Sequence, residues 1–417
     1  MNEVLSCISC KQSYSISEIR YLCDCGSLLN VSRDTSYLKN LPVVFDERLA
    51  SRKKIDRSGV WRFREGVLNA ALPAKICTHP EGITQLYQRK SLSLWADCEQ
   101  TWLKHEGENP SGSFKDRGMT VAITQAKRMA KKIIACASTG NTSASLACYA
   151  ASTACQAVVF IPEGKISIGK LSQALAYGAT CLSVDGDFDA AMKLVTEASN
   201  DLGIYLVNSL NPFRIEGQKT IIWDILQSFN WEAPDWIITP AGNLGNTSAF
   251  GKAIKEAYEA AWIKKKPRLA AIQASGANPF FQSYKANFSV LTPVKAKTLA
   301  SAIQIGNPVN FSKASQSILE CEGLVEEVSD QEILAAKFEI DRSGIGCEPA
   351  SACSLAGLKK LRSQGIIKKS DKVVCILTGN LLKDAENSIK SVEQFKSKTV
   401  YKIGNNIKDL EKIINNF

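Results

Sequence analysis

The sequence predicts an α/β protein with parallel sheets, from its length, its composition and the order of its elements. The 417 residues are 45% apolar and 22% charged, which suits two or three domains with their own cores and excludes disorder over most of the length. From about residue 60 onward, short apolar runs alternate with helix-like segments. This alternation indicates parallel strands covered by helices.

The expected strands are the short apolar runs Lys132–Ala137, Ala157–Ile161, Thr180–Val184, Ile204–Val207, Trp236–Thr239, Leu269–Gln273 and Lys372–Leu377. The expected helices between them include Met119–Lys131, Gly169–Tyr177, Asp187–Asp201, Ile215–Phe229, Asn246–Ala261, Asp330–Asp341 and Ala350–Gln364. No apolar run approaches the roughly 18 residues that a membrane-spanning helix needs. Contact with a membrane is therefore not expected.

The first 30 residues stand apart, because they hold two close cysteine pairs. Cys7 and Cys10 form a C-x-x-C pair, and Cys23 and Cys25 follow in the same short polar segment. Four thiolates at this spacing resemble a zinc ribbon, although the second pair is one residue tighter than usual. Two interpretations stay open: a Zn²⁺ site, or a small hairpin without a metal.

The remaining composition narrows the function further. The net charge is +10, but the basic clusters are dispersed and lack interleaved aromatic residues, so nucleic-acid binding is not expected. The positive charge mildly favours a small anionic substrate. With only two histidines, a multi-histidine metal site is disfavoured. The start of the chain shows no signal peptide, so we expect a cytoplasmic protein whose other cysteines are reduced.

The pentapeptide Gly-Asn-Thr-Ser-Ala occurs twice, at 140–144 and 245–249, each time after an expected strand and before an expected helix. Glycine permits a sharp turn and a close approach to a ligand, and the free amides of the following helix attract an anion. Two such loops suggest two anions held side by side. Chance recurrence of small residues explains the repeat equally well.

The segment Asn-Pro-Ser-Gly-Ser-Phe-Lys-Asp-Arg-Gly-Met at 109–119 places a lysine at the start of a helix. Ser113 is expected to cap this helix. Lys115 is unfavourable there because the helix dipole prefers acidic residues, but a lowered pKa would suit a nucleophilic amine. On these residues alone, an ordinary surface lysine beside Asp116 and Arg117 is the simpler interpretation.

This segment resembles the Schiff-base lysine motif of threonine synthases, within the tryptophan synthase β-like, fold-type II family of pyridoxal phosphate enzymes. Six further segments resemble that family in the same order, at 137–143, 164–179, 240–246, 302–308, 348–352 and 377–380. The resemblance covers roughly residues 60–385. It implies two parallel-sheet domains with the cofactor between them, preceded here by the small cysteine-containing extension.

The resemblance also implies cofactor contacts. Lys115 would form the Schiff base with pyridoxal 5'-phosphate and afterwards move protons as a free amine. Asn141 would bind the 3-hydroxyl oxygen of the ring, and Thr378 would face the pyridine nitrogen, leaving it uncharged. The cofactor phosphate would rest on backbone amides of Gly242, Asn243, Leu244, Gly245 and Asn246.

Substrate contacts follow from the resemblance in the same way. Ser138 and Thr139 would hold the carboxylate of the amino acid. Asn208, Ser209 and Thr142 would join Arg214 around the phosphate of the substrate, because a guanidinium is a strong donor to phosphate oxygens. Without the resemblance, Arg214 would be read as a surface residue at the start of a helix.

The implied reaction converts O-phospho-L-homoserine and water to L-threonine and phosphate, the last step of threonine biosynthesis, with the released phosphate assisting as a general base. The nearest alternative is a threonine or serine dehydratase, which needs no second phosphate site. An idle homologue or zinc-dependent scaffold is the alternative outside enzymes.

The expected domains are a zinc-ribbon-like segment at 1–30, a large cofactor-binding domain at 60–110 plus 221–390, a small mobile domain at 111–220, and a peripheral tail at 391–417. A homodimer is expected.

Overall fold

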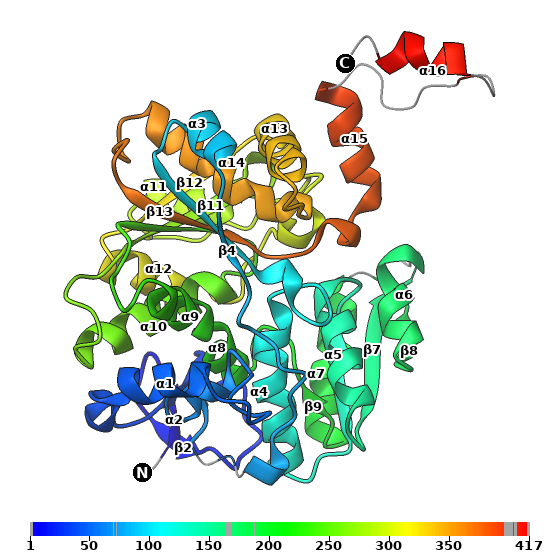
Figure 1. Cartoon of the computed structure of the whole chain (residues 1–417). Coiled ribbons are helices and arrows are strands. Elements are labelled where there is room, and N and C mark those ends of the chain that lie inside the picture. Colours follow the sequence, from blue (N-terminus) through cyan, green and yellow to red (C-terminus); the bar gives the residue numbers. More distant parts are fainter. Residues whose placement is uncertain are drawn as a thin grey trace.

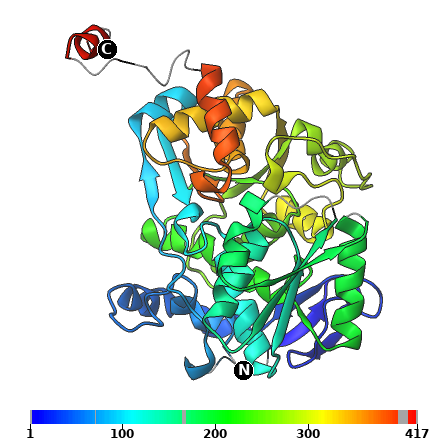
Figure 2. The same cartoon turned by 90° about the vertical axis from the view of Figure 1, so that its right-hand side faces the viewer.

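The computed structural model describes residues 3–69, 71, 73–163, 168–186, 188–395, 403 and 407–414. Their strands form three sheets, of six, four and three strands (Figure 1). The six-stranded sheet lies in the upper half of the molecule and the four-stranded sheet in the lower half, as Figure 2 shows from the side. The α/β class with parallel sheets is therefore confirmed.

The larger sheet has the order β12 (Leu324–Val328), β11 (Arg268–Ala274), β10 (Trp236–Pro240), β13 (Lys372–Leu377), β5 (Gln100–His105) and β4 (Leu86–Gln88). Neighbouring strands are parallel except β4 and β5. Successive residues face opposite cores: Ile237 and Val374 belong to one cluster, Ile238 and Cys375 to the other. Both faces are covered, which explains why β10, β11 and β13 are largely apolar along their whole length.

Helices cover both faces of this sheet. One core contains apolar residues of α9 (Thr220–Ser228), α10 (Gly245–Glu259) and α12 (Phe311–Glu320). The other contains residues of α3 (Lys90–Ala96), α13 (Asp330–Arg342) and α14 (Pro349–Ser363). Further helices are α11 (Pro279–Lys285), α15 (Ala385–Phe395) and α16 (Ile407–Ile414). Within the described residues, no helix is both long and apolar enough to cross a bilayer.

The smaller sheet is parallel throughout, in the order β8 (Thr180–Val184), β7 (Gln156–Pro162), β6 (Ile133–Ala137) and β9 (Tyr205–Leu206). One face packs against α4 (Lys115–Arg128), α5 (Asn141–Ala151) and α6 (Ile168–Ala176), and the other against α7 (Phe188–Asp201). Strand β6 is central and nearly all buried, as expected for a strand covered on both faces.

The N-terminal residues form a third, antiparallel sheet in the order β2 (Ser13–Ser15), β1 (Val4–Cys7) and β3 (Leu29–Ser32). It lies at the bottom of Figure 1, in dark blue. Arg33, just after β3, forms an ion pair with Glu216 of α8 (Pro212–Gln218), with an Nη1–Oε2 distance of 2.7 Å. Two short helices, α1 (Leu41–Leu49) and α2 (Arg64–Val67), follow.

The expected strands all exist, and their ends differ from the observed ends by no more than one residue. The single helix expected over Ile215–Phe229 is wrong, because the structure has α8 and α9 there. Lys219 separates them, and the Ile222 amide donates to the Lys219 carbonyl at 3.1 Å, three residues back, which tightens the chain at the junction. Asp187 and residues 164–167, within two other expected segments, lie outside the described residues.

Candidate active site

A cavity of about 1470 Å³ opens where the parallel strands of both larger sheets end. Segments that follow β5, β6, β9, β10 and β13 line it, as is usual for ligand sites in α/β sheets. Every residue expected to contact cofactor or substrate lines this cavity: Lys115, Ser138, Thr139, Asn141, Thr142, Asn208, Ser209, Arg214, Gly242, Asn243, Leu244, Gly245, Asn246 and Thr378.

Lys115 is the first residue of α4, and the turn before it is held by Asp116. The Asp116 carboxylate accepts from the Ser111 amide at 2.6 Å and from the Ser111 hydroxyl at 2.5 Å. The expectation that Ser113 caps α4 is wrong: Phe114 occupies the cap position without a side-chain bond, and the buried Ser113 hydroxyl has no partner in the described chain. The turn before Lys115 is therefore fixed from inside the helix, by Asp116.

The Lys115 amine lies in the cavity without an ion pair to any described residue, 4.2 Å from the centre of the Phe114 ring. Burial lowers the pKa of Lys115 to about 7, and the positive charge of Arg214 acts in the same direction. The negative charge of Glu348 opposes this shift only in part. At neutral pH a large fraction of this amine is uncharged, as a nucleophile or base requires.

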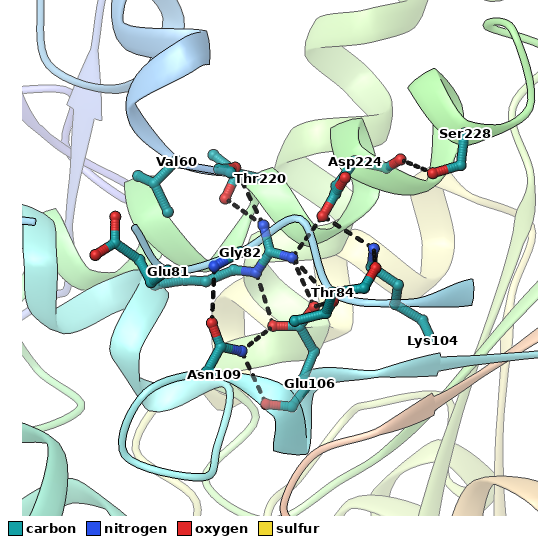
Figure 3. A network of polar contacts seen from close by, with 12 residues as sticks. Val60, Glu81, Gly82, Thr84, Lys104, Glu106, Asn109, Thr220, Asp224 and Ser228 are labelled. Carbon is teal, nitrogen blue, oxygen red and sulfur yellow. Dashed lines mark hydrogen bonds and ion pairs between the residues drawn. The ribbon is translucent and has the colours of Figure 1, made fainter. Parts of the chain in front are cut away.

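A buried ionic network lies beneath the start of α4 (Figure 3). Arg117 donates to both oxygens of Glu106 at 2.7 Å and to Asp224 at 2.7 Å. Lys104 donates to the same oxygen of Asp224 at 2.9 Å, and Asn109 donates to Glu106 at 2.8 Å. These cations hold the pKa values of Glu106 and Asp224 below their usual range. The network ties β5, α4 and α9 together behind Lys115.

Arg214, on α8, is a buried cation with no carboxylate partner among the described residues. Its side chain is 3% exposed, its Nη1 donates to the Val207 carbonyl at 3.1 Å, and its Nε has no partner in the described chain. Burial lowers the pKa of Arg214 to about 10. The buried guanidinium groups of Arg62 and Arg117, by contrast, each pair with Asp224. A buried charge is costly unless it is paired, so Arg214 suits an anionic ligand.

The loop after β10 presents backbone amides to the cavity. The Ala241 amide donates to the Ile272 carbonyl and the Ser248 amide to the Leu244 carbonyl. No acceptor in the described chain faces the amides between them, at 242–247. Leu244 has a φ of 63°, in the left-handed region, where it turns the chain into α10. A Cβ on Gly242 would stand 3.1 Å from Ile303, so glycine keeps this loop open. Unbonded amides arranged in this way at a helix N-terminus suit an anion such as phosphate.

The other copy of the pentapeptide, at 140–144, forms a similar loop at the start of α5. The Gly140 amide donates to the Ser138 hydroxyl at 3.2 Å, and the Ala144 amide donates to the Gly140 carbonyl. The amides of residues 141–143 have no acceptor within the described structure. The two copies therefore do face one cavity, as the sequence suggested.

Asn208 lines the cavity, and both polar atoms of its side chain bond to the backbone. Its Oδ1 accepts from the Ala137 amide and its Nδ2 donates to the Ala137 carbonyl, both at 2.9 Å. The side chain therefore joins the end of β6 to the segment after β9. Ser209 beside it also lines the cavity, and its carbonyl accepts from Asn310.

Two side chains that the sequence interpretation did not name as site residues lie beside Asn141 and Thr378. Glu348 accepts from Asn141 Nδ2 at 3.2 and 3.0 Å. The hydroxyl oxygens of Ser351 and Thr378 are 3.0 Å apart. Both lie in the segment 348–352, whose resemblance to the family was the available signal.

The four N-terminal cysteines come together outside this cavity. The sulfur atoms of Cys7, Cys10, Cys23 and Cys25 all lie within 4.8 Å of one another. Cys7 and Cys25 are 3.6 Å apart, and Cys10 and Cys23 are 3.4 Å apart. Hydrogen bonds from Ser27 lower the pKa of Cys25 to about 6, which favours the thiolate that binds metals.

Comparison with known proteins agrees with this geometry. Residues 77–379 match the family described as pyridoxal-phosphate dependent enzyme. The chain is 44% identical to the threonine synthase of Methanocaldococcus jannaschii, covering 93% of this chain and 95% of that protein. It is 43% identical to the threonine synthase of Methanosarcina acetivorans, covering 94% of each. The crystal structure of threonine synthase from Escherichia coli superposes with a TM-score of 0.69, at 18% identity and 99% coverage of both chains.

Proposed function

Because the chain belongs to the pyridoxal-phosphate dependent enzymes and, within them, to the threonine synthases, we propose that this cavity converts O-phospho-L-homoserine and water into L-threonine and phosphate. One observation carries the substrate assignment: Arg214 is a buried cation that forms no ion pair with a carboxylate of the described chain, and it lines the same cavity as Lys115. A phosphate on the substrate would satisfy it.

The residues present fit pyridoxal phosphate. The unoccupied amides at 242–246 suit its phosphate, and the Lys115 amine is free to react with its aldehyde. Asn141 and Thr378 line the same cavity and would contact the ring oxygen and the ring nitrogen. When bound, the cofactor supplies an electron sink for charge that develops on the substrate carbons.

The protein contributes binding and proton transfer. The loop at 138–142 would hold the substrate carboxylate through Ser138, Thr139 and free amides. Lys115 Nζ, uncharged in a large fraction at neutral pH, would take one proton from Cα and then one from Cβ, which frees the electron pair that expels phosphate from Cγ. It would afterwards return one proton to Cγ and one to Cα. The hydroxyl of Thr378 carries no charge, so it would leave the ring nitrogen unprotonated and the electron sink mild.

Arg214 would hold the phosphate of the substrate. It would also stabilise the negative charge of this phosphate as the phosphate leaves Cγ. Ser209 and Thr142 supply neutral hydroxyls from the same cavity wall. Asn208 would contribute by fixing the position of Ser209, since both ends of its side-chain amide are bonded to Ala137. The released phosphate would then assist the addition of water at Cβ as a general base.

We also propose that Zn²⁺ occupies the N-terminal cluster of Cys7, Cys10, Cys23 and Cys25. Tetrahedral zinc with Zn–S bonds of about 2.3 Å places its sulfur ligands about 3.8 Å apart. The observed separations of 3.4 and 3.6 Å, and a spread within 4.8 Å, are close to that geometry. All four thiols are free of disulfides.

The proposal also includes the domain division, the oligomeric state and the location of the protein in the cell. The four-stranded sheet supports a small mobile domain at 111–220, and the six-stranded sheet supports a large domain at 60–110 plus 221–390. Closure of the small domain would bring Arg214 onto the substrate. A homodimer and a cytoplasmic location stay predictions, to be checked by light scattering of the holoenzyme and by cell fractionation.

Two measurements test this function: the products formed from O-phospho-L-homoserine, and the lysine to which the cofactor is covalently fixed. The purified holoenzyme should convert O-phospho-L-homoserine to threonine and phosphate in equal amounts. Borohydride reduction should fix the cofactor to the peptide that contains Lys115. Formation of 2-oxobutanoate in place of threonine, or a label on another lysine, would overturn the assignment.

A further inference from the structure

Glu348 is a buried carboxylate in the cavity for which the proposed function assigns no task. It precedes α14 and is 5% exposed. Its carboxyl group occupies the space left by the missing side chain of Gly379, where a Cβ would stand 2.5 Å from the carboxyl carbon. A carboxylate fits here because a glycine follows Thr378 directly after the end of β13.

The partners of this carboxylate are the two side chains that would face the cofactor ring. Asn141 Nδ2 donates to both carboxylate oxygens, at 3.2 and 3.0 Å, and Thr378 Oγ1 lies 3.5 Å from one of them. No lysine or arginine of the described chain forms an ion pair with it. The charged groups that face it are Lys115, Lys383 and Asp384, and burial raises the pKa of Glu348.

The chemistry of these partners makes the contact directional. An ionised carboxylate only accepts hydrogen bonds, so it fixes which end of the Asn141 amide is the nitrogen. The amide nitrogen has two hydrogens, and one of them bonds to Glu348. The other stays available to a ligand oxygen in the cavity. With a neutral amide in place of the carboxylate, Asn141 could turn over and present its oxygen instead.

We propose that Glu348 is a positioning residue for the reaction: it orients Asn141 so that one amide hydrogen faces the oxygen on the cofactor ring. This inference rests on the proposed function, because that function places Asn141 beside the ring. Glu348 acts through Asn141 and does not itself exchange protons with the substrate.

A double-mutant cycle on cofactor affinity tests this inference. The dissociation constant of pyridoxal phosphate is measured by fluorescence titration of apoenzyme, for wild type, Glu348→Gln, Asn141→Ala and the double variant. Glu108→Gln is the matched control, because Glu108 also lines the cavity but bonds to Gln85 and Tyr87. Thermal unfolding of each apoenzyme shows whether the variant folds. If Glu348→Gln does not fold, Glu348→Asp is used in its place.

We expect Glu348→Gln to raise the dissociation constant about tenfold in the wild-type background, the size of one charge-assisted hydrogen bond. In the Asn141→Ala background the same change should alter it less than twofold, since the residue it orients is gone. The ratio between Glu348→Gln and wild type should shrink as pH falls, because protonated Glu348 no longer enforces the orientation. Glu108→Gln should leave the affinity unchanged.

The outcomes separate this inference from the proposed function. An effect of Glu348→Gln that is equally large in both backgrounds, or that is absent in both, overturns the positioning role. If Asn141→Ala binds pyridoxal phosphate with the same dissociation constant as wild type, the assignment of Asn141 to the cofactor ring is wrong. The proposed cofactor site is then wrong as well.

Discussion

Gly217 of α8 lies directly against Arg117 of α4. A Cβ on Gly217 would stand 1.7 Å from the Arg117 carbonyl oxygen, so only glycine permits this approach. Gly118 meets α8 in turn, because its Cβ would stand 3.0 Å from the Arg214 carbonyl oxygen. These two backbone contacts set the distance between the helices that carry Lys115 and Arg214. Glycine packing between α4 and α8 thus fixes how far apart Lys115 and Arg214 lie in the cavity.

Gly217→Ala should therefore impair both stability and substrate binding. The overlapping atoms are backbone, which no rotamer change can relieve, so α4 and α8 must separate. We expect a loss of about 1–3 kcal/mol in the free energy of unfolding, typical of overpacking, and a raised KM for phosphohomoserine. Denaturant unfolding and steady-state kinetics measure the two effects. Wild-type values for both would show that the helix spacing does not position the site.

The lowered pKa of Lys115 gives a prediction for cofactor attachment. The reactive species is the uncharged amine, whose fraction rises with pH and saturates above the pKa. With a pKa of about 7, the rate of covalent attachment to apoenzyme should rise about tenfold from pH 6 to pH 8 and then level off. An ordinary lysine, with a pKa near 10.4, would give a rise of about 100-fold with no plateau. Stopped-flow absorbance distinguishes the two profiles.

The sequence allowed much of this site to be anticipated because its residues lie in contiguous motifs. Each motif follows a strand, and parallel strands end at the same edge of a sheet. Lys104 and Glu348 show where this reasoning stops. Lys104 is buried within β5 because Asp224, distant in the sequence, neutralises it. Its strand, Gln100–His105, is too polar to be recognised from its own residues.

Glu348 could not be assigned for a related reason. Its role depends on the space beside Gly379 and on Asn141, which comes from the other sheet. Nothing local to Glu348 specifies those partners. The cap expected from Ser113 failed for a different, local reason, because the nearby Asp116 carboxylate bonds to Ser111 and holds the turn. Contacts between segments far apart in sequence are what the motifs alone do not encode.

Zinc in the N-terminal cluster predicts a stoichiometric and structural effect. The purified protein should contain about one zinc per chain, measured by inductively coupled plasma mass spectrometry. Chelation or Cys10→Ser should remove the metal and lower the unfolding temperature by several degrees. Cofactor occupancy should persist, since the cysteines lie outside the cavity.

Cys181→Ser is the matched control for this metal site, because Cys181 is a partly exposed free thiol on β8 of the smaller sheet. It should retain the zinc and the unfolding temperature of wild type. Equal metal content in wild type and in Cys10→Ser would contradict the zinc site.

Arg214→Ala shows whether Arg214 holds the substrate phosphate in the cavity that contains Lys115. The measurement is kcat/KM for O-phospho-L-homoserine, set beside the binding of L-threonine, which has no phosphate, from its effect on cofactor absorbance. Loss of a charge-assisted contact worth roughly 1.5–3 kcal/mol should lower kcat/KM by about one to two decades. L-Threonine binding and cofactor occupancy should change little. Equal losses for phosphohomoserine and threonine would show that Arg214 is structural and does not hold the substrate phosphate.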